Sequence, residues 1–228
     1  MTVSLHDTHF DDDGLLFSKQ FEDHYFSRNG GAAECMHVFL NGNDLPKRWE
    51  NGTNFNIGEL GFGTGLNFLT TWQIWQQLRR DGQMLIFTSV EAFPVDRKTA
   101  HRAIEPYEAF GELRDQLLLQ WDELFADHSW QADPQTTLRV IAEPVECALD
   151  GFPPIDAWYL DGFAPARNPD MWSQPVMQAI ADHSAPTATF ASYTAAGWVR
   201  RNLQEAGFDV EKRPGFGTKR DMIAGRLP

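Results

Sequence analysis

The sequence predicts an α/β domain built on a mostly parallel β-sheet, and three observations lead to this fold class. From residue 55 onward, short apolar runs alternate with amphipathic segments, which is the pattern of a parallel sheet covered by helices on both faces. One run is continuously apolar, as in strands that are buried on both faces. The glycine-rich segment GFGTG (61–65) interrupts the chain directly after the first run, where such sheets bind their ligands.

The first half of this pattern contains two strands and two helical stretches. FNIGEL (55–60) predicts a short buried strand, and MLIFTSVEAF (84–93) predicts the second. Between them, apolar residues at spacings of three or four predict a helix over 66–80. Its apolar face carries Phe68, Leu69, Trp72, Trp75 and Leu78. Residues 97–127 have a helical pattern as well, with one apolar side.

The second half adds three strands, a helix and a hairpin. The strands are TLRVIAEP (137–144), IDAWYLDGF (155–163) and TATFASYT (187–194). Residues 196–207 predict a helix that Gly207 ends as a C-terminal cap. The last stretch, 208–227, predicts an antiparallel hairpin that closes the sheet.

The first 54 residues are expected to form an extension packed on the core, and residues 55–228 to form the main domain as one structural unit. Turn-forming residues gather at 11–14, 29–31 and 41–44. They surround short apolar runs such as CMHVFL (35–40), which predicts a segment that contains a hairpin.

Composition places the chain among globular proteins, because 42% of its residues are apolar and 22% are charged. No apolar stretch is long enough for a membrane span, and the N-terminus lacks a signal sequence, so we expect a soluble cytoplasmic protein that does not act at membranes. We also expect a monomer. The net charge of −13 argues against nonspecific nucleic-acid binding. The last 32 residues carry a net charge of +3, however, which fits either a surface that binds a polyanion or an ordinary solvated surface. The basic residues there are Arg200, Arg201, Lys212, Arg213, Lys219, Arg220 and Arg226.

The two cysteines, Cys35 and Cys147, form no CxxC pair and no disulfide framework. Cys35 and His37 are two residues apart with no second pair nearby, so we expect no metal site. Two reduced thiols, buried or half-buried, are the expected state.

The glycine loop favours one cofactor over another. Glycines at 61, 63 and 65 let the backbone approach a ligand closely, at the start of a helix. The dinucleotide fingerprint would require a further glycine where Leu66 stands. Glu59, two residues before the loop, would repel a pyrophosphate but suits an ammonium group. The pattern therefore favours S-adenosylmethionine over a nicotinamide dinucleotide, which stays open as the alternative.

Three further acids follow predicted strands. Glu91 would bind ribose hydroxyls, which both cofactor types require, and Glu143 would meet an adenine amino group. Asp161, in YLDGFAPARNPDMW (159–172), follows the strand that approaches the glycine loop. Each glutamate alone could be a solvated strand end, but successive strand-end acids after a glycine loop indicate a binding site.

These stretches resemble the methyltransferase part of the tRNA 5-methylaminomethyl-2-thiouridine biosynthesis (MnmC-like) family. The resemblance is carried by IGELGFGTGLNFLTTW, YLDGFAPARNPDMW and RRNLQEAGF…KRPGFGTKRDMIAG, and EDHYFSRNG near the N-terminus extends it over nearly the whole chain. It implies a Rossmann-like class I S-adenosylmethionine-dependent methyltransferase with a mostly parallel seven-stranded sheet. It also implies methyl transfer to the amine of 5-aminomethyl-(2-thio)uridine at the tRNA wobble position.

The resemblance assigns residues as well. The cofactor site would comprise Glu59, Gly61, Phe62, Gly63, Thr64, Gly65, Asn67, Glu91, Glu143 and Asp161. Asp161 would be catalytic, facing the amine. Apart from the resemblance, we expect the substrate side to comprise Gly162, Phe163, Pro165, Arg167, Lys219 and Arg220. Gly162 would leave space for the amine, Phe163 and Pro165 would wall the pocket, and the basic residues would meet tRNA phosphates.

Two departures from the family qualify this assignment. The family often has Gly-Asp where this chain has Ala142-Glu143, so the acid is kept but its side chain is longer. Many members continue into an FAD-dependent oxidase domain, which we do not expect in this chain, although such an oxidase domain or a separate protein would act in the same pathway. A noncatalytic tRNA-binding module is the alternative from outside the enzymes.

Overall fold

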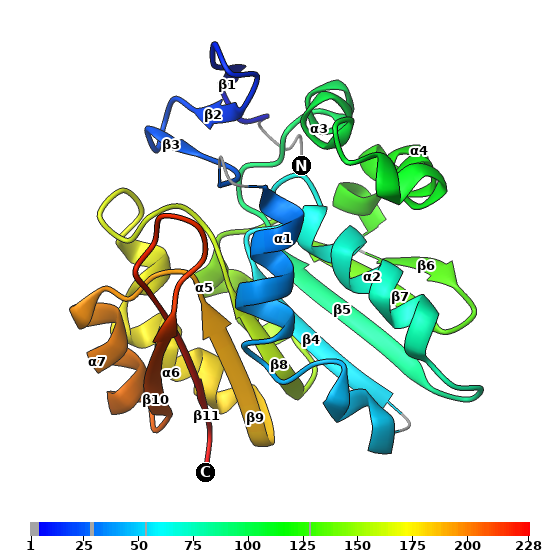
Figure 1. Cartoon of the computed structure of the whole chain (residues 1–228). Coiled ribbons are helices and arrows are strands. Elements are labelled where there is room, and N and C mark those ends of the chain that lie inside the picture. The colour runs from blue at the N-terminus through cyan, green and yellow to red at the C-terminus, as the bar shows by residue number, and fades with distance from the viewer. Residues whose placement is uncertain (1–4, 28–29, 53, 128) are drawn as a thin grey trace.

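The computed structural model (Figure 1) describes residues 5–27, 30–52, 54–127 and 129–228. Its centre is an eight-stranded sheet in the order β10-β11-β9-β8-β4-β5-β7-β6. The parallel strands are β4 (Asn54–Leu60), β5 (Met84–Val90), β7 (Thr136–Ile141), β8 (Ile155–Leu160) and β9 (Ser184–Ser192). The antiparallel pairings involve β6 (Ser129–Asp133), β10 (Asp209–Pro214) and β11 (Asp221–Arg226). The predicted α/β class with a mostly parallel sheet is confirmed, and β10 pairs antiparallel with β11 at the C-terminal end of the chain.

The strand count differs from the expected seven by one strand. All seven expected strands are present, and β6 is the eighth, paired antiparallel with β7 at one edge of the sheet. Its sequence, SWQAD, has no apolar run, and none of its residues is fully buried. An edge strand held mainly by backbone hydrogen bonds to one neighbour leaves little trace in a hydrophobicity pattern.

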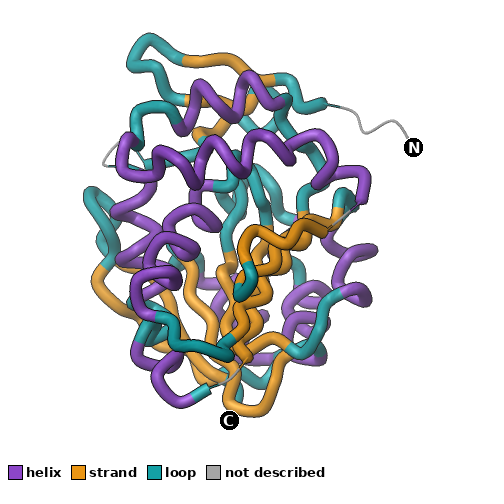
Figure 2. Tube along the Cα trace, turned by 90° about the vertical axis from the view of Figure 1, so that its right-hand side faces the viewer, coloured by secondary structure: helices purple, strands orange, loops and turns teal. Residues whose placement is uncertain are grey.

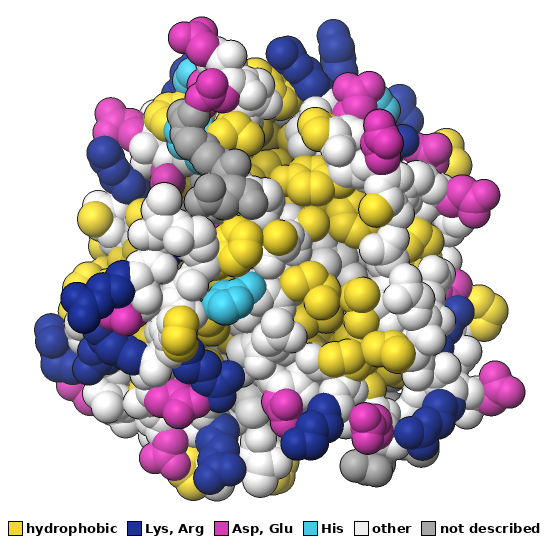
Figure 3. Space-filling view, in the orientation of Figure 1, with side chains coloured by type: hydrophobic (Ala, Val, Ile, Leu, Met, Phe, Trp, Pro, Cys, Tyr) yellow, Lys and Arg dark blue, Asp and Glu magenta, His cyan; other side chains and the backbone are white. Residues whose placement is uncertain are grey.

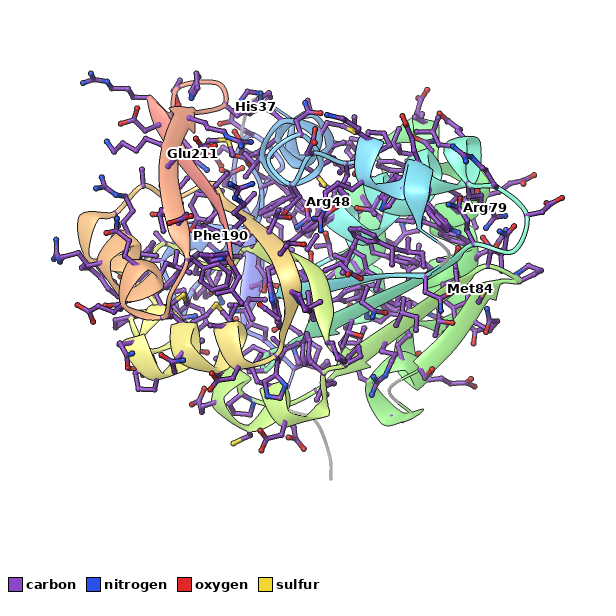
Figure 4. The ribbon with its side chains drawn as sticks, turned by 90° about the horizontal axis from the view of Figure 1, so that it is seen from below. His37, Arg48, Arg79, Met84, Phe190 and Glu211 are labelled. Carbon is purple, nitrogen blue, oxygen red and sulfur yellow. The ribbon has the colours of Figure 1, made fainter. Side chains whose placement is uncertain are left out.

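Helices cover both faces of the sheet (Figures 2 and 4). On one face lie α2 (Leu66–Leu78), α3 (Arg97–Ile104) and α4 (Gly111–Asp127), and on the other lie α5 (Val145–Ala148), α6 (Gln174–Asp182) and α7 (Gly197–Glu205). Short 3-10 turns occupy Glu108–Phe110, Leu149–Gly151 and Asp170–Trp172. Two separate apolar clusters fill the spaces: Trp72 and Trp121 belong to the first, and Trp158 and Trp172 to the second. The sheet is therefore buried on both faces, which explains the continuous apolar runs.

Two helix predictions need correction. The stretch 97–127 is broken between α3 and α4, because Pro106 cannot continue a helix and Gly111 adopts a positive φ of 21°. In α2 the predicted apolar face is buried except for Leu78, which is 52% exposed at the last residue of the helix. Gly207, with a φ of 101°, ends α7 as predicted.

The N-terminal segment forms a small sheet and a set of short helices. The sheet contains β1 (Thr8–Phe10), β2 (Leu16–Ser18) and β3 (Asp23–His24), and it lies over the carboxyl ends of the parallel strands (Figures 1 and 2). The turn predicted at 11–14 joins β1 to β2, whereas the turn predicted at 29–31 lies partly outside the described residues. The run CMHVFL is helical and not part of a hairpin, because it spans the end of α1 (Gly31–Cys35) and a π-helical turn at Met36–Leu40. A further 3-10 turn spans Lys47–Asn51.

This error has a simple physical cause. A short apolar run fits a buried strand and a buried helix equally well, and only its surroundings decide. Here Val38, Phe39 and Leu40 are all buried, and Phe39 stacks on Tyr159 of β8 at 5.0 Å between ring centres.

Candidate active site

A cavity of about 360 Å³ opens at the carboxyl ends of the central strands. Leu60, the last residue of β4, pairs with Val90 of β5 on one side and with Leu160 of β8 on the other. Gly61, Glu91 and Asp161 therefore leave the sheet at the same level. In open parallel sheets, ligands bind where the chain order reverses, and β4 is this position here.

Segments far apart in sequence line this cavity. The glycine loop and the start of α2, the residues after β5, β8 and β9, and Lys219 in the β10–β11 loop form its base and one side. Residues 23–27 and α1 close it from the N-terminal segment. The first 54 residues thus contribute to the site.

The glycine loop has conformations that other residues rarely adopt. Gly61, Gly63 and Gly65 have φ values of 83°, 57° and 76°. A Cβ on Gly65 would lie 2.8 Å from a methyl group of Leu117, so this glycine is required by packing against α4. Gly61 and Gly63 line the cavity, and Gly65 does not.

Glu91 is fastened to the glycine loop. Its Oε2 accepts a hydrogen bond from Gly63 N at 2.8 Å, and its Oε1 accepts one from Phe93 N at 2.8 Å. Burial raises the pKa of Glu91, while these two N–H groups oppose the rise. The carboxylate that we expect to bind ribose is thus held at the cavity wall.

Asn67 joins two carboxylates. Its Nδ2 donates to Glu59 Oε1 at 2.9 Å and to Asp161 Oδ2 at 2.8 Å. Glu59 is fully buried, and its Oε2 accepts a hydrogen bond from Ser89 Oγ at 2.6 Å. Burial raises the pKa of Glu59 well above its ordinary value. Glu59 does not line the cavity, and Asn67 links it by hydrogen bonds to Asp161, which does.

Asp161 lines the cavity with a strongly perturbed carboxyl group. Burial raises its pKa to about 6, against hydrogen bonds from Asn67 and from Gly162 N that lower it. At pH 7 about nine in ten molecules still carry the ionised form. The site thus presents a carboxylate that can accept a hydrogen bond or a proton near neutral pH.

The loop after Asp161 is fixed by several contacts. Gly162 has a φ of 121°, and a Cβ there would lie 2.4 Å from Met171 Sδ. The structure thus requires glycine at this position for backbone conformation and for packing. This reason is separate from the expected one, which was space for the substrate amine. Tyr193 Oη donates to Gly162 O at 2.8 Å. Trp172 Nε1 donates to Phe163 O at 3.0 Å, which ties the loop to the second apolar cluster.

The N-terminal segment holds the other side of this loop. Phe163 stacks on Phe21 at 4.5 Å between ring centres and meets Tyr25 edge to face at 5.2 Å. Ala164 N donates to Asp23 Oδ2 at 2.9 Å. Phe163 lines the cavity, but part of its ring is already covered by these aromatic neighbours.

The structure brings most of the expected site residues to the cavity. Those that line it are Gly61, Phe62, Gly63, Thr64, Asn67, Glu91, Asp161, Gly162, Phe163 and Lys219. Those that do not are Glu59, Gly65, Glu143, Pro165, Arg167 and Arg220.

The outlying residues have identifiable surroundings. Glu143 is exposed, because Ile141 pairs with Val90 and Glu143 therefore lies one residue beyond the level of Glu91. Pro165 is buried. Arg167 forms an ion pair with Glu22.

Sequence reasoning missed several cavity residues. They include Asp23, Tyr25, Glu34, Cys35 and Tyr193. Tyr193 directly follows β9, so the strand-end rule that found Asp161 would have found it. Residues 23–27 lie within the stretch EDHYFSRNG that carried the family resemblance, and this was the available signal.

Metal and thiol chemistry have little support here. Among the described residues, no group of three or more His, Cys, Asp and Glu side chains is placed to hold a metal ion. Cys35 is buried, and burial raises the pKa of its thiol. Cys147 is exposed, which corrects the expectation that both thiols are at least half-buried.

No described helix has the length and hydropathy of a membrane span.

The charges of the cavity suit a cationic ligand. Asp23, Glu34, Glu91 and Asp161 line it, and among the described residues Lys219 is the only lysine or arginine that does so. A pyrophosphate would meet several carboxylates, whereas S-adenosylmethionine carries an ammonium and a sulfonium group. The residues present therefore fit this cofactor better than a dinucleotide.

Comparisons with known proteins agree with this geometry. A family model described as S-adenosyl-L-methionine-dependent methyltransferase matches residues 108–228. The chain is 46% identical over 220 residues to the tRNA 5-methylaminomethyl-2-thiouridine biosynthesis bifunctional protein MnmC of Nitrosospira multiformis, covering 94% of this chain and 36% of that protein. It is 42% identical to the protein of the same name from Maricaulis maris, covering 92% and 37%. The chain thus spans about a third of the length of these relatives.

Two solved structures share the fold. The model superposes on MnmC2 of Aquifex aeolicus with a TM-score of 0.77 at 21% identity, covering 98% of this chain and 71% of that one. Spermidine synthase of Thermotoga maritima gives 0.54 at 12% identity, covering 97% and 68%. Together with the cavity and the family match, these findings show that the chain belongs to the S-adenosyl-L-methionine-dependent methyltransferase family.

Proposed function

We propose that this methyltransferase methylates the amine of 5-aminomethyl-(2-thio)uridine at the wobble position of tRNA. The observation that carries the proposal is Asp161, a carboxylate that Asn67 holds beside the glycine loop at the reversal point of the sheet. The relatives named for 5-methylaminomethyl-2-thiouridine biosynthesis support the choice of substrate.

The substrate amine sets the chemical problem. An alkyl amine has a pKa of about 10, so on the order of one molecule in a thousand is neutral at pH 7. Only the neutral form has a lone pair for attack. When bound, S-adenosylmethionine supplies a methyl group on a sulfonium centre. The protein must therefore hold the amine in line with this methyl group and take up or pass on its proton.

We assign this task to Asp161. Its ionised carboxylate accepts a hydrogen bond from the amine and stabilises the positive charge that grows on nitrogen as the N–C bond forms. A nearby cation favours the ionised form and makes the carboxylate a weaker base. We therefore assign Asp161 an orienting and electrostatic role, with the proton passing finally to water.

Glu91 and the 61–64 backbone would hold the cofactor, and Asn67 would set the distance between the cofactor and Asp161. Glu59 would orient Asn67 through the hydrogen bond between them. The buried Oγ1 of Thr64, which has no hydrogen-bond partner within the described protein, adds a polar atom to the same loop. Glu143 has no place in this proposal, because it is exposed outside the cavity.

The tRNA would approach over the C-terminal hairpin. Lys and Arg side chains gather over α7, β10 and β11, on the left of Figure 3. Two of them are already paired: Lys212 with Asp221 at 2.6 Å and Arg213 with Glu211 at 2.5 Å. The nonspecific attraction to RNA is thus modest, and selectivity would rest on the modified base. Such a substrate implies action in the cytoplasm.

The relatives are named bifunctional, and this chain spans about a third of their length. We propose that their other activity, an FAD-dependent oxidase by the resemblance noted above, acts in the same pathway as this chain.

Nucleoside mass spectrometry provides the test. The protein is incubated with S-adenosylmethionine and tRNA from cells that lack this methylation, and the modified uridine is expected to gain the mass of one CH₂ group. Tight binding of NADH without methylation would favour an oxidoreductase, and tRNA binding without methylation would favour a binding module. Methylation of tRNA that lacks the aminomethyl group would refute the proposed specificity.

A further inference from the structure

A cation already lies in this cavity, supplied by the protein itself. Lys219 Nζ is 2.8 Å from Glu34 Oε1 and 4.0 Å from the centre of the Tyr193 ring. All three side chains line the cavity. A carboxylate and an aromatic face are the groups that proteins use to bind an ammonium ion. The Lys219 ammonium therefore marks a cation-binding position.

The two sides of this contact differ in how firmly they are held. The Glu34 side chain is 13% exposed on α1, and Tyr193 is fixed by its hydrogen bond to Gly162 O and by edge-to-face packing on Trp172 at 6.3 Å. The Lys219 side chain is 39% exposed and comes from the loop between β10 and β11. A flexible lysine in contact with solvent can leave, whereas the carboxylate and the ring stay in place.

The cation-binding position is close to Asp161. Tyr193 contacts Gly162, the residue that follows Asp161 in the chain. Glu34 and Lys219 both act on Asp161 electrostatically, because Glu34 raises the pKa of Asp161 and Lys219 lowers it. A group bound between Glu34 and Tyr193 would thus lie near Asp161.

An ammonium ion is the form in which the substrate amine arrives, because its pKa of about 10 keeps it protonated at pH 7. Building on the proposed function, we propose that Glu34 and the ring of Tyr193 bind the ammonium form of the substrate's aminomethyl group, and that Lys219 occupies this position until the substrate displaces it. Once displaced, the Lys219 ammonium is available to an RNA phosphate, which agrees with the phosphate contact expected for this residue from the sequence.

The test uses two nucleosides as competitive inhibitors of tRNA methylation, 5-aminomethyluridine and uridine, so that phosphate contacts do not contribute. The measured quantity is the ratio of their inhibition constants, which isolates the aminomethyl group. In Glu34→Gln we expect the preference for 5-aminomethyluridine to fall about tenfold, as expected for loss of a charged hydrogen bond. Calorimetry with S-adenosylhomocysteine should give the wild-type affinity for the cofactor site.

Lys219→Met provides the second arm. Removing the competing cation is expected to tighten inhibition by 5-aminomethyluridine at least about threefold, by mass action, and to leave uridine unchanged. The matched control is the ion pair of Lys19 and Asp7, which has the same 2.8 Å separation outside the cavity. Asp7→Asn and Lys19→Met should leave both inhibition constants unchanged.

Each outcome is decisive. If wild-type protein methylates aminomethyl-bearing tRNA but Glu34→Gln keeps the full preference for 5-aminomethyluridine, this inference is wrong and the proposed function stands. Equal weakening of both nucleosides and of S-adenosylhomocysteine would show a structural role for Glu34 and would also overturn it. If wild-type protein does not methylate this tRNA, the proposed function fails, and the inference fails with it.

Discussion

Replacing Asp161 by asparagine should stabilise the folded protein at neutral pH while it removes activity. Folding buries this carboxyl group and raises its pKa from 3.8 to about 6. A raised pKa in the folded state means that the folded protein holds the proton more tightly. Wild-type stability therefore falls as pH rises from below 3.8 through about 6, and this loss persists at higher pH.

The magnitude follows from the two pKa values. Relative to a carboxyl group with no shift, the free energy of unfolding of the wild-type protein is lower by about 1 kcal/mol at pH 4.5 and by about 3 kcal/mol at pH 7.5. Asparagine does not titrate. The carboxylate of Asp161 accepts hydrogen bonds from Asn67 and Gly162 on its two oxygens, whereas an asparagine side chain has only one oxygen. The lost hydrogen bond costs about 1 kcal/mol at either pH. We thus expect Asp161→Asn to match the wild type at pH 4.5 and to exceed it by about 2 kcal/mol at pH 7.5.

Urea unfolding of both proteins without cofactor at the two pH values measures this difference, since other titrating groups largely cancel between the two proteins. At pH 7.5 the melting temperature should rise by about 4–8 °C. If the difference in free energy of unfolding between the two proteins does not grow with pH, the ionised carboxylate of Asp161 does not destabilise the folded protein. Our account of its pKa would then be wrong. Turnover of Asp161→Asn should fall by at least about a hundredfold with unchanged S-adenosylhomocysteine affinity; turnover within a few-fold of the wild type would refute the catalytic role.

Three further predictions test the surroundings of this residue. Gly162→Ala should lower the free energy of unfolding by about 2–3 kcal/mol, because its Cβ would lie 2.4 Å from Met171 Sδ. Gly14 also has a positive φ, but no atom lies within 4 Å of a Cβ built there, so Gly14→Ala isolates the cost of backbone strain. An equal loss of stability in both variants would contradict the steric argument. Asn67→Asp should weaken S-adenosylhomocysteine binding at least about tenfold in calorimetry, since it removes the N–H donor that holds the Glu59 and Asp161 carboxyl groups in place; an unchanged affinity would argue against this bridge. Glu143→Gln should leave that affinity within about twofold, because Glu143 lies outside the cavity; a loss of about tenfold would restore its predicted adenine contact.

Much of the sheet could be predicted from the sequence because its strands carry local signals. The run at 84–90 is mostly apolar, as expected for a strand buried on both faces, and the glycine loop directly follows β4, where the backbone adopts positive φ values. Edge strand β6 escaped notice because it buries little and depends on backbone hydrogen bonds to β7. The helical form of 35–40 also escaped, since a run of six residues, five of them apolar, has no periodicity that separates helix from strand.

The sequence by itself determined which groups stand at the strand ends, because glycines, buried runs and the acids that follow them are local features. It thus identified Glu91 and Asp161, together with the cofactor that the loop favours. Only the tertiary structure decided which of these groups meet. Strand register aligned Glu91 and Asp161 with the glycine loop and left Glu143 outside. The packing of the N-terminal segment brought Glu34 to Lys219, 185 residues later in the chain, and no local pattern records a contact between residues that only the folded sheet brings together.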